Sequence, residues 1–147
     1  MPSIKLEEVD LVNSVHDILD LFSDEKINIE LDTKLNSALV EADKNQFKRM
    51  LINMFRNSVQ ANSSKIKIAI EANHENFDMI ISDNGKGIPN DIQSKIFETN
   101  FTTKQKGMGL GLKLTKRFIE NINGNLYLMQ SNSSGTTFKI TIPKLIK

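Results

Sequence analysis

The sequence predicts an α/β protein, a two-layer α/β sandwich whose mixed, mostly antiparallel sheet carries three main helices on one face. Three segments repeat apolar residues at helical spacing, and about six shorter segments alternate apolar with polar residues. The later alternating segments follow one another through short turns, as antiparallel strands do. Because strands and helices do not alternate regularly, a doubly wound nucleotide-binding fold is disfavoured.

The first half of the chain predicts two helices and four strands. Apolar residues at helical spacing predict a helix over residues 10–22 and a longer one that begins after Asp43 and ends near Ala61. The Asp43 carboxylate stands where it can accept hydrogen bonds from the first free amides of that longer helix. Alternating apolar residues predict strands at 27–31, 38–42, 66–70 and 77–81.

The second half begins with a long loop. Residues 83–111 contain five of the seven glycines and show no sustained periodicity beyond a helical turn at 91–97. A loop of this length in a compact domain is usually functional. A third helix is predicted from Leu110 to Ile122, ended by Gly124, and two last strands follow at 126–130 and 136–142.

The composition is that of one ordinary globular domain over residues 1–147. The chain is 39% hydrophobic and 25% charged, which is enough for a core without metals or disulfides. It has no cysteine, which excludes thiol catalysis, thiolate metal sites and disulfides. The net charge of +1 gives no general attraction for nucleic acid or an anionic membrane, so we expect neither as a partner of this domain.

No targeting signal is recognisable at the start of the chain, and no apolar run approaches the about 20 residues that span a bilayer. We therefore expect a cytoplasmic domain, whose parent protein can still be anchored in a membrane.

Two glycine-rich segments flank the long loop. One, residues 83–87 (DNGKG), follows a strand directly, and the other, residues 107–111 (GMGLG), directly precedes a helix. Glycine allows close approach of a ligand to the backbone, and the free amides at a helix start bind phosphate. Neither segment has the spacing of the P-loop or of the dinucleotide fingerprint. The pair predicts an anion site of another kind, whereas each segment alone also fits a simple turn.

Asp83 is the most specific polar position. Counting by twos places it on the same strand face as Met79 and Ile81, so its carboxylate lies on the core side and needs a donor. The exocyclic amine of a nucleotide base is one such donor. The alternative is that Asp83 only caps the following turn. Thr136 shares a face with Phe138, and its inward hydroxyl could complete the same pocket.

Asn53 and Asn57 lie four residues apart and therefore on one side of the long helix. Two amide oxygens one turn apart can hold a hydrated Mg²⁺ ion that also takes phosphate oxygens. The spacing alone equally fits a solvated pair of asparagines.

Five motifs occur along the chain in the order of a known set. They are Asn53-Met-Phe-Arg-Asn57, Asp83-Asn-Gly-Lys-Gly87, Phe97 with Phe101-Thr-Thr-Lys104, Gly107-Met-Gly-Leu-Gly-Leu112 and Gly135-Thr-Thr-Phe138. This series resembles the N, first glycine, F, second glycine and third glycine boxes of sensor histidine kinases, in the GHKL ATPase superfamily shared with gyrase, Hsp90 and MutL, which has the Bergerat fold. The segment 101–112, together with residues 58–61 (SVQA), looks most like the nitrogen-regulation type.

The resemblance implies the catalytic ATP-binding domain of a two-component kinase, with ATP and Mg²⁺ as cofactors. Asn57 would ligate Mg²⁺ and Asn53 would support it, both acting with Lys104 in catalysis. Asp83 would bind the adenine amine, with Thr136 behind it. The other ATP-binding residues would be Gly85, Gly87, Ile88, Thr102, Thr103, Lys104, Gly107, Gly109, Leu110 and Gly111.

The resemblance also implies how the domain is organised. Residues 89–107 would be the ATP lid, with Phe97 and Phe101 as packing residues, and residues 1–9 would be the end of a linker from a dimerisation domain. The Lys-Tyr pair that often follows the second asparagine is absent, so helix-side phosphate contact is expected from Arg56 or Gln60.

Position 53 separates branches of the superfamily. ATP-hydrolysing relatives and anti-sigma serine kinases usually carry a glutamate there as a general base, whereas this chain has asparagine. A neutral imidazole is already nucleophilic and needs only a positioned γ-phosphoryl group. His16 and His74 lack the context of a kinase phosphoacceptor. The implied partners are a histidine-bearing dimerisation domain of the same kinase and, indirectly, a response regulator, and we expect the isolated domain to be monomeric.

Two alternatives stay open: a stand-alone serine kinase of the anti-sigma type, and a nucleotide-binding module without transfer activity.

Overall fold

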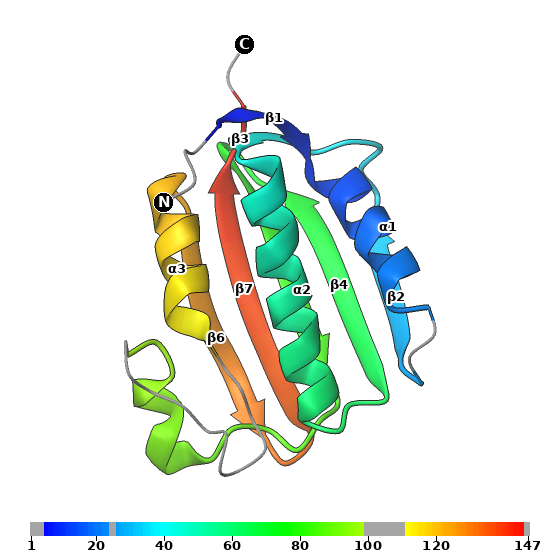
Figure 1. Ribbon diagram of the computed structural model, residues 1–147, viewed down its shortest axis with the longest axis vertical. Helices are drawn as coiled ribbons and strands as arrows, with labels where there is room; N and C mark the ends of the chain where they lie inside the picture. The colour runs from blue at the N-terminus through cyan, green and yellow to red at the C-terminus, as the bar shows by residue number, and fades with distance from the viewer. Residues whose placement is uncertain (1–4, 24–25, 99–110, 146–147) are drawn as a thin grey trace.

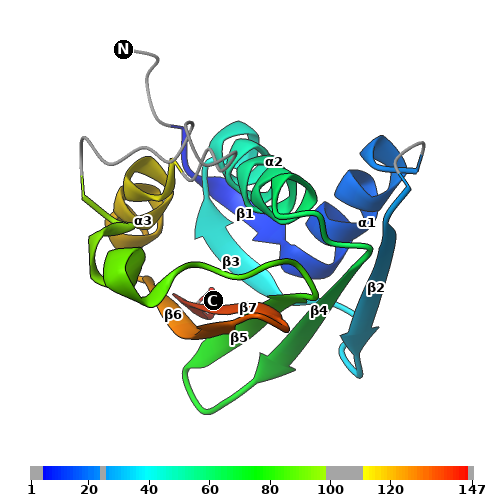
Figure 2. The ribbon, with the colours of Figure 1, turned by 90° about the horizontal axis from the view of Figure 1, so that it is seen from below.

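The structure is a computed structural model that describes residues 5–23, 26–98 and 111–145. Within these residues, three α-helices lie side by side over one face of a five-stranded sheet (Figures 1 and 2). The helices are α1 (Leu11–Leu21), α2 (Lys44–Gln60) and α3 (Leu112–Asn121). The predicted two-layer sandwich with helices on one face is confirmed. None of the described helices is both long and apolar enough to cross a bilayer.

The main sheet is mixed, as predicted. Its spatial order is β2 (Asn28–Thr33), β4 (Lys65–Ala72), β5 (Asn76–Asp83), β7 (Gly135–Pro143) and β6 (Asn125–Asn132). Only the β2–β4 pair among these is parallel, and α2 lies within the connection between the two strands, as a parallel pair requires. The β6–β7 hairpin turns through Ser133 and Ser134, which is tighter than the turn predicted from the sequence.

A second, two-stranded sheet joins β1 (Glu7–Asp10) to β3 (Leu39–Ala42) in antiparallel register. Strand β1 was not predicted, because its residues Glu-Glu-Val-Asp contain a single apolar side chain and carry no alternation. The pairing Val9↔Val40 supplies the contact that the local pattern does not reveal.

Aspartates begin the first two helices. Asp10 accepts from the Val12 amide at 3.0 Å, and Asp43 accepts from the Gln46 amide at 3.1 Å, which confirms the N-cap predicted there. A second amide, that of Lys5, donates to Asp43 at 3.0 Å. The backbone amides of Lys5 and Gln46 hold the pKa of the Asp43 carboxyl below its ordinary value.

Helix α3 is shorter than predicted. Its N-cap is Gly111, in the left-handed conformation with φ +48°, and its last helical residue is Asn121. After the helix the left-handed residue is Asn123, with φ +65°, rather than Gly124. Gly124 instead donates its amide to the Ile119 carbonyl at 2.9 Å, which satisfies one of the last free carbonyls.

The core lies between the helices and the sheet. The apolar faces of α1 and α2 meet the inward side chains of β4, β5 and β7, each of which alternates buried and less buried positions. The largest fully buried side chains include Phe47, Phe55, Leu11, Ile18, Leu51, Ile66, Ile68, Ile70 and Met79. Burial of one such side chain is worth roughly 1.5–3 kcal/mol, so this layer fixes the sheet and α2 relative to each other.

Candidate functional site

One end of the two layers collects most of the predicted polar residues. The C-terminal end of α2 and the start of β7 lie at the lower end of the molecule in Figure 1, with the start of α3 higher up. The register pair Asp83↔Thr136 places the end of β5 beside the start of β7. Two side-chain hydrogen bonds connect these elements: Ser58 to Asp83 joins α2 to β5, and Asn53 to Thr115 joins α2 to α3. The residues predicted on three separate segments therefore meet at one place.

The Asp83 carboxylate is held by three donors among the described residues. Oδ1 accepts from the backbone amides of Gly85 at 3.0 Å and Thr136 at 3.2 Å, and Oδ2 accepts from the Ser58 hydroxyl at 2.7 Å. The bond to Gly85 is the turn cap considered from the sequence. The other two bonds fix the carboxylate against α2 and β7, so Asp83 does more than cap its turn. The residue is partly exposed.

Thr136 points inward, as predicted. It pairs with Asp83 in the register of β5 and β7, and it is 5% exposed. Its Oγ1 lies 2.8 Å from Ser131 Oγ, which also accepts from the Ile88 amide at 2.7 Å. The predicted residue Ile88 is thereby tied to β6. Ser131 was missed from the sequence because it stands in a run of small polar residues that reads as turn material.

Two of the predicted glycines are required by the fold itself. A Cβ on Gly87, which has φ +81°, would lie 2.0 Å from the Asn132 carbonyl oxygen, and one on Gly85 would lie 2.7 Å from the Ala61 carbonyl oxygen. The segment after β5 is therefore pressed against the β6–β7 hairpin on one side and the end of α2 on the other. Close approach of backbone to backbone already requires glycine at both positions, and the predicted contact with a ligand stays a prediction.

Asn53 bridges two helices. Its Nδ2 donates to Thr115 Oγ1 at 3.1 Å and lies 3.5 Å from the Gly111 carbonyl oxygen. Asn57 is 8% exposed, and its Oδ1 atom is buried. Arg56 and Gln60, the expected helix-side phosphate contacts, are exposed.

The donor set on α2 fits Mg²⁺. Amide oxygens are hard ligands, and Mg²⁺ usually takes only one or two protein ligands while it keeps waters and substrate phosphates. Among the described residues no three His, Cys, Asp or Glu side chains gather into a metal site. Asn53 and Asn57 are thus the side chains of this site that could share a metal ion with a phosphate-bearing ligand.

The first part of the predicted lid packs on the body of the domain. Residues Asn90–Lys95 form a short 3-10 helix, η1, and Ile92 and Ile96 are buried in the core. Gln93 fastens this segment, since its Nε2 donates to the carbonyls of Ile88 at 2.8 Å and Ser131 at 3.2 Å. Phe97 packs against the core as expected, with Lys116 Nζ 5.0 Å from its ring centroid.

Several predicted residues lie outside the described part of the chain. They are Phe101, Thr102, Thr103, Lys104, Gly107, Gly109 and Leu110. Their roles stay predictions.

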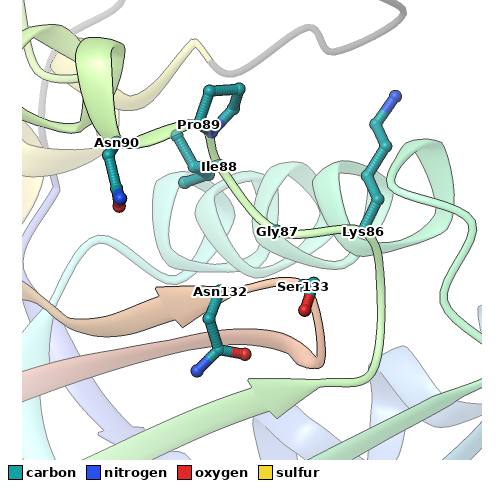
Figure 3. A pocket seen from close by; sticks show the side chains of 7 residues that line it. All are labelled: Lys86, Gly87, Ile88, Pro89, Asn90, Asn132 and Ser133. Carbon is teal, nitrogen blue, oxygen red and sulfur yellow. The ribbon is translucent and has the colours of Figure 1, made fainter.

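A cavity of about 450 Å³ lies beside the site (Figure 3). It is lined by Lys86, Gly87, Ile88, Pro89, Asn90, Asn132 and Ser133. The segment after β5 forms one wall and the β6–β7 hairpin forms the other, and the side chains of Lys86 and Asn132 extend in opposite directions. Asn53, Asn57, Asp83 and Thr136 do not line it, so this cavity is distinct from the place where the predicted polar residues meet.

Known proteins resemble this chain in sequence and in fold. Residues 42–146 match the family described as "Histidine kinase-, DNA gyrase B-, and HSP90-like ATPase". Sporulation kinase A of Bacillus subtilis is 34% identical over 120 residues, which are 80% of this chain and 20% of the relative. The chain belongs to the histidine kinase-, gyrase B- and HSP90-like ATPase family, and it spans about a fifth of the length of the first relatives it matches.

Solved structures agree with this assignment. The nucleotide-free catalytic domain of histidine kinase ThkA superposes with a TM-score of 0.85 at 30% identity and covers 95% of this chain and 96% of that domain. A second structure shows ThkA in complex with the response regulator protein TrrA, with a TM-score of 0.80, 27% identity, and coverage of 97% of this chain and 42% of that one. The similarity extends over almost the whole chain.

Proposed function

We propose that this chain binds Mg-ATP and transfers the γ-phosphoryl group to a histidine on a separate dimerisation domain, as the catalytic domain of a two-component sensor histidine kinase. The observation that carries the proposal is the Asp83 carboxylate. It is fixed by Ser58, Gly85 and Thr136 at the end of the helix that bears Asn53 and Asn57. The proposed acceptor for the nucleotide base, Asp83, and the proposed metal ligands, Asn53 and Asn57, then lie toward the same end of the domain.

At the base end, the chain's own groups do the recognition. Asp83 would accept the exocyclic amine of adenine, and the inward hydroxyl of Thr136 would close the pocket behind it. Gly85, Gly87 and Ile88 carry the backbone that follows Asp83, and the bond from the Ile88 amide to Ser131 holds this backbone in place. A site that offers a hydrogen-bond acceptor to the adenine amine discriminates strongly against bases that lack this amine.

At the phosphate end, Asn57 and Asn53 would hold Mg²⁺ through their amide oxygens. The metal ion would neutralise charge on the β- and γ-phosphates during transfer. Gly111 is the N-cap of α3, and the first-turn amides of a helix are groups that bind phosphate oxygens. From the segment outside the described residues, we assign phosphate contacts to Thr102, Thr103 and Lys104 and an ATP contact to Leu110. We assign the lid hinge to Gly107 and Gly109 together with Gly111.

The acceptor is proposed to be a histidine because position 53 holds an amide. An asparagine side chain cannot take a proton from a serine hydroxyl or from water, whereas a neutral imidazole needs no such base. The Asn53 side chain is also engaged with Thr115, which suits a structural and metal-supporting role. Within the family, the pattern of residues 101–112 together with residues 58–61 favours the nitrogen-regulation type of kinase. A response regulator is the proposed final receiver of the phosphoryl group, as the ThkA–TrrA complex suggests.

Binding of a fluorescent ATP analogue to Asp83→Asn tests the nucleotide site. We expect loss of binding with a retained fold, because the amide presents a donor where the adenine amine needs an acceptor. Asp78→Asn is the matched control: Asp78 lies on the same strand, and its carboxylate pairs instead with Thr141 and Asn73. Undiminished binding by Asp83→Asn would refute the assignment of the base pocket.

Transfer to a separately supplied histidine-bearing dimerisation domain tests the reaction. We expect a phosphorylated product that is labile in acid, as phosphohistidine is. An acid-stable product would favour the serine kinase alternative. ATP binding without any transfer would favour a nucleotide-binding module.

A further inference from the structure

We propose that Ser58 is a positioning residue for base selection: its hydroxyl holds the Asp83 carboxylate so that one acceptor site on Oδ2 faces the base. The inference rests on the proposed function, because it concerns the group with which Asp83 would read a purine. It assigns a role in nucleotide selectivity to a residue that the sequence did not single out as a site residue.

The hydrogen bonds of Asp83 give its two carboxylate oxygens different roles. Each carboxylate oxygen offers about two acceptor positions. On Oδ1 both are taken, by the amides of Gly85 at 3.0 Å and Thr136 at 3.2 Å. On Oδ2 the Ser58 hydroxyl takes one, at 2.7 Å. With respect to the described residues, the carboxylate is therefore left with one position on Oδ2 for a single N–H donor.

Ser58 is well placed to act in this way. It is 4% exposed, and it follows Asn57 directly on α2. A serine inside a helix often donates back to a carbonyl of its own helix, whereas this one donates across to β5. The bond is short because the acceptor is a carboxylate, and it is worth more than a bond between neutral groups. The helix that carries Asn57 is thereby joined directly to the carboxylate that reads the base.

This arrangement favours a 6-amino purine over a 6-keto purine. An amine places a hydrogen against the remaining position on Oδ2, whereas a keto oxygen would place a lone pair against it. Without the Ser58 hydroxyl, Oδ2 can rotate away or bind water in two positions, and the amine loses its fixed partner. The Oδ1 side keeps its two backbone amides, so the pocket itself should persist.

The experiment measures the affinities of wild type and variants for ATP and inosine triphosphate (ITP), by titration in EDTA so that metal binding plays no part. Ser58→Ala is the test variant. Ser63→Ala is the matched control, because Ser63 is a buried serine just beyond the same helix whose Oγ makes no hydrogen bond within the described residues. Thermal melting of each variant reports any general loss of structure.

We expect wild type to prefer ATP over ITP, and Ser58→Ala to weaken ATP binding by about tenfold while ITP binding stays unchanged. Ser63→Ala should keep the wild-type ratio. Ser58→Thr, which retains a hydroxyl, should restore most of the ATP preference. A merely structural role would lower both affinities together and leave their ratio unchanged.

Two outcomes separate this inference from the proposed function. If wild type binds neither nucleotide, the proposed function fails. If wild type binds ATP in preference to ITP and Ser58→Ala leaves that ratio unchanged, the proposed function stands and the role of Ser58 is refuted.

Discussion

The base end and the phosphate end of the site are built in different ways. At the base end, strand β5, the segment after it and the β6–β7 hairpin touch through their backbones: a Cβ on Gly135 would lie 1.9 Å from the Asp83 carbonyl oxygen. At the phosphate end, Asn53 meets the start of α3 through side-chain contacts, and a Cβ on Gly111 would lie 3.6 Å from Asn53 Oδ1. The backbone at the base end is tightly packed, whereas the backbone at Gly111, at the phosphate end, has ordinary van der Waals clearance.

This difference suits the two tasks. Base recognition needs an acceptor whose position does not change, which backbone contacts and three hydrogen bonds provide for Asp83. Phosphate binding and release need an element that can shift, and the ordinary clearance around Gly111, just before Leu112 anchors α3 in the core, leaves more freedom there than the packed backbone of the base end. The two ends share α2, which carries Ser58 for the base and Asn53 for the start of α3.

Gly135→Ala should have the largest effect. Its φ of +140° and the 1.9 Å approach to the Asp83 carbonyl leave no room for a methyl group, so we expect a loss of about 3 kcal/mol or more in the free energy of unfolding. Chemical denaturation measures it. Ser134→Ala, at the exposed neighbouring position, should change little. If Gly135→Ala were as stable as that control, the base end would not be packed as described.

Gly111→Ala should have a smaller effect of a different kind. Among the described residues the methyl group meets nothing closer than 3.6 Å, so the expected cost is that of the left-handed backbone, about 1–2 kcal/mol. Gly111→Asn should recover part of this loss, because asparagine tolerates that conformation. Denaturation of both variants measures the difference. A loss as large as that of Gly135→Ala would remove the contrast between the two ends.

Gln93→Ala should loosen the segment that follows the base end. Removing the bonds to the Ile88 and Ser131 carbonyls should cost about 0.5–1 kcal/mol and act locally. We expect faster amide hydrogen exchange at Ile92 and Glu98, whose amides donate within this segment, with core strands unchanged. Gln130→Ala, at an exposed position on β6, is the control. Unaltered exchange would show that Gln93 does not fasten this segment.

Asp43→Asn should have the smallest effect, a small loss of stability that is present at neutral pH and disappears in acid. The native pKa of Asp43 lies below the unfolded value of 3.8, so the unfolded state binds more protons between the two values. The stabilisation is present above pH 3.8 and is lost as the pH falls through the native pKa. Asp43→Asn should therefore show a flatter decline of stability than wild type over this interval. Nucleotide affinity at neutral pH should stay unchanged, because Asp43 lies at the end of α2 opposite to the nucleotide site. A changed affinity would contradict this separation of Asp43 from the site.

Much of the fold and part of the site were predictable from local patterns. Helical spacing located α1 and α2, the N-cap at Asp43 was evident, and counting by twos placed the Asp83 carboxylate inward. Strand β1 and the parallel β2–β4 pairing could not be found, because both depend on partners distant in sequence. Ser58, Ser131 and Gln93 were missed for the same reason: each acts through a hydrogen bond to a residue on another element.

The most direct test of the two-ended site is the affinity of Asn57→Ala for a non-hydrolysable ATP analogue, measured by calorimetry in EDTA and again with Mg²⁺. Wild type should bind in EDTA through its base end and gain affinity when Mg²⁺ is added. We expect Asn57→Ala to bind as wild type does in EDTA but to lose most of the gain from Mg²⁺. Retention of the full gain by Asn57→Ala would contradict the proposed metal-binding role of this helix.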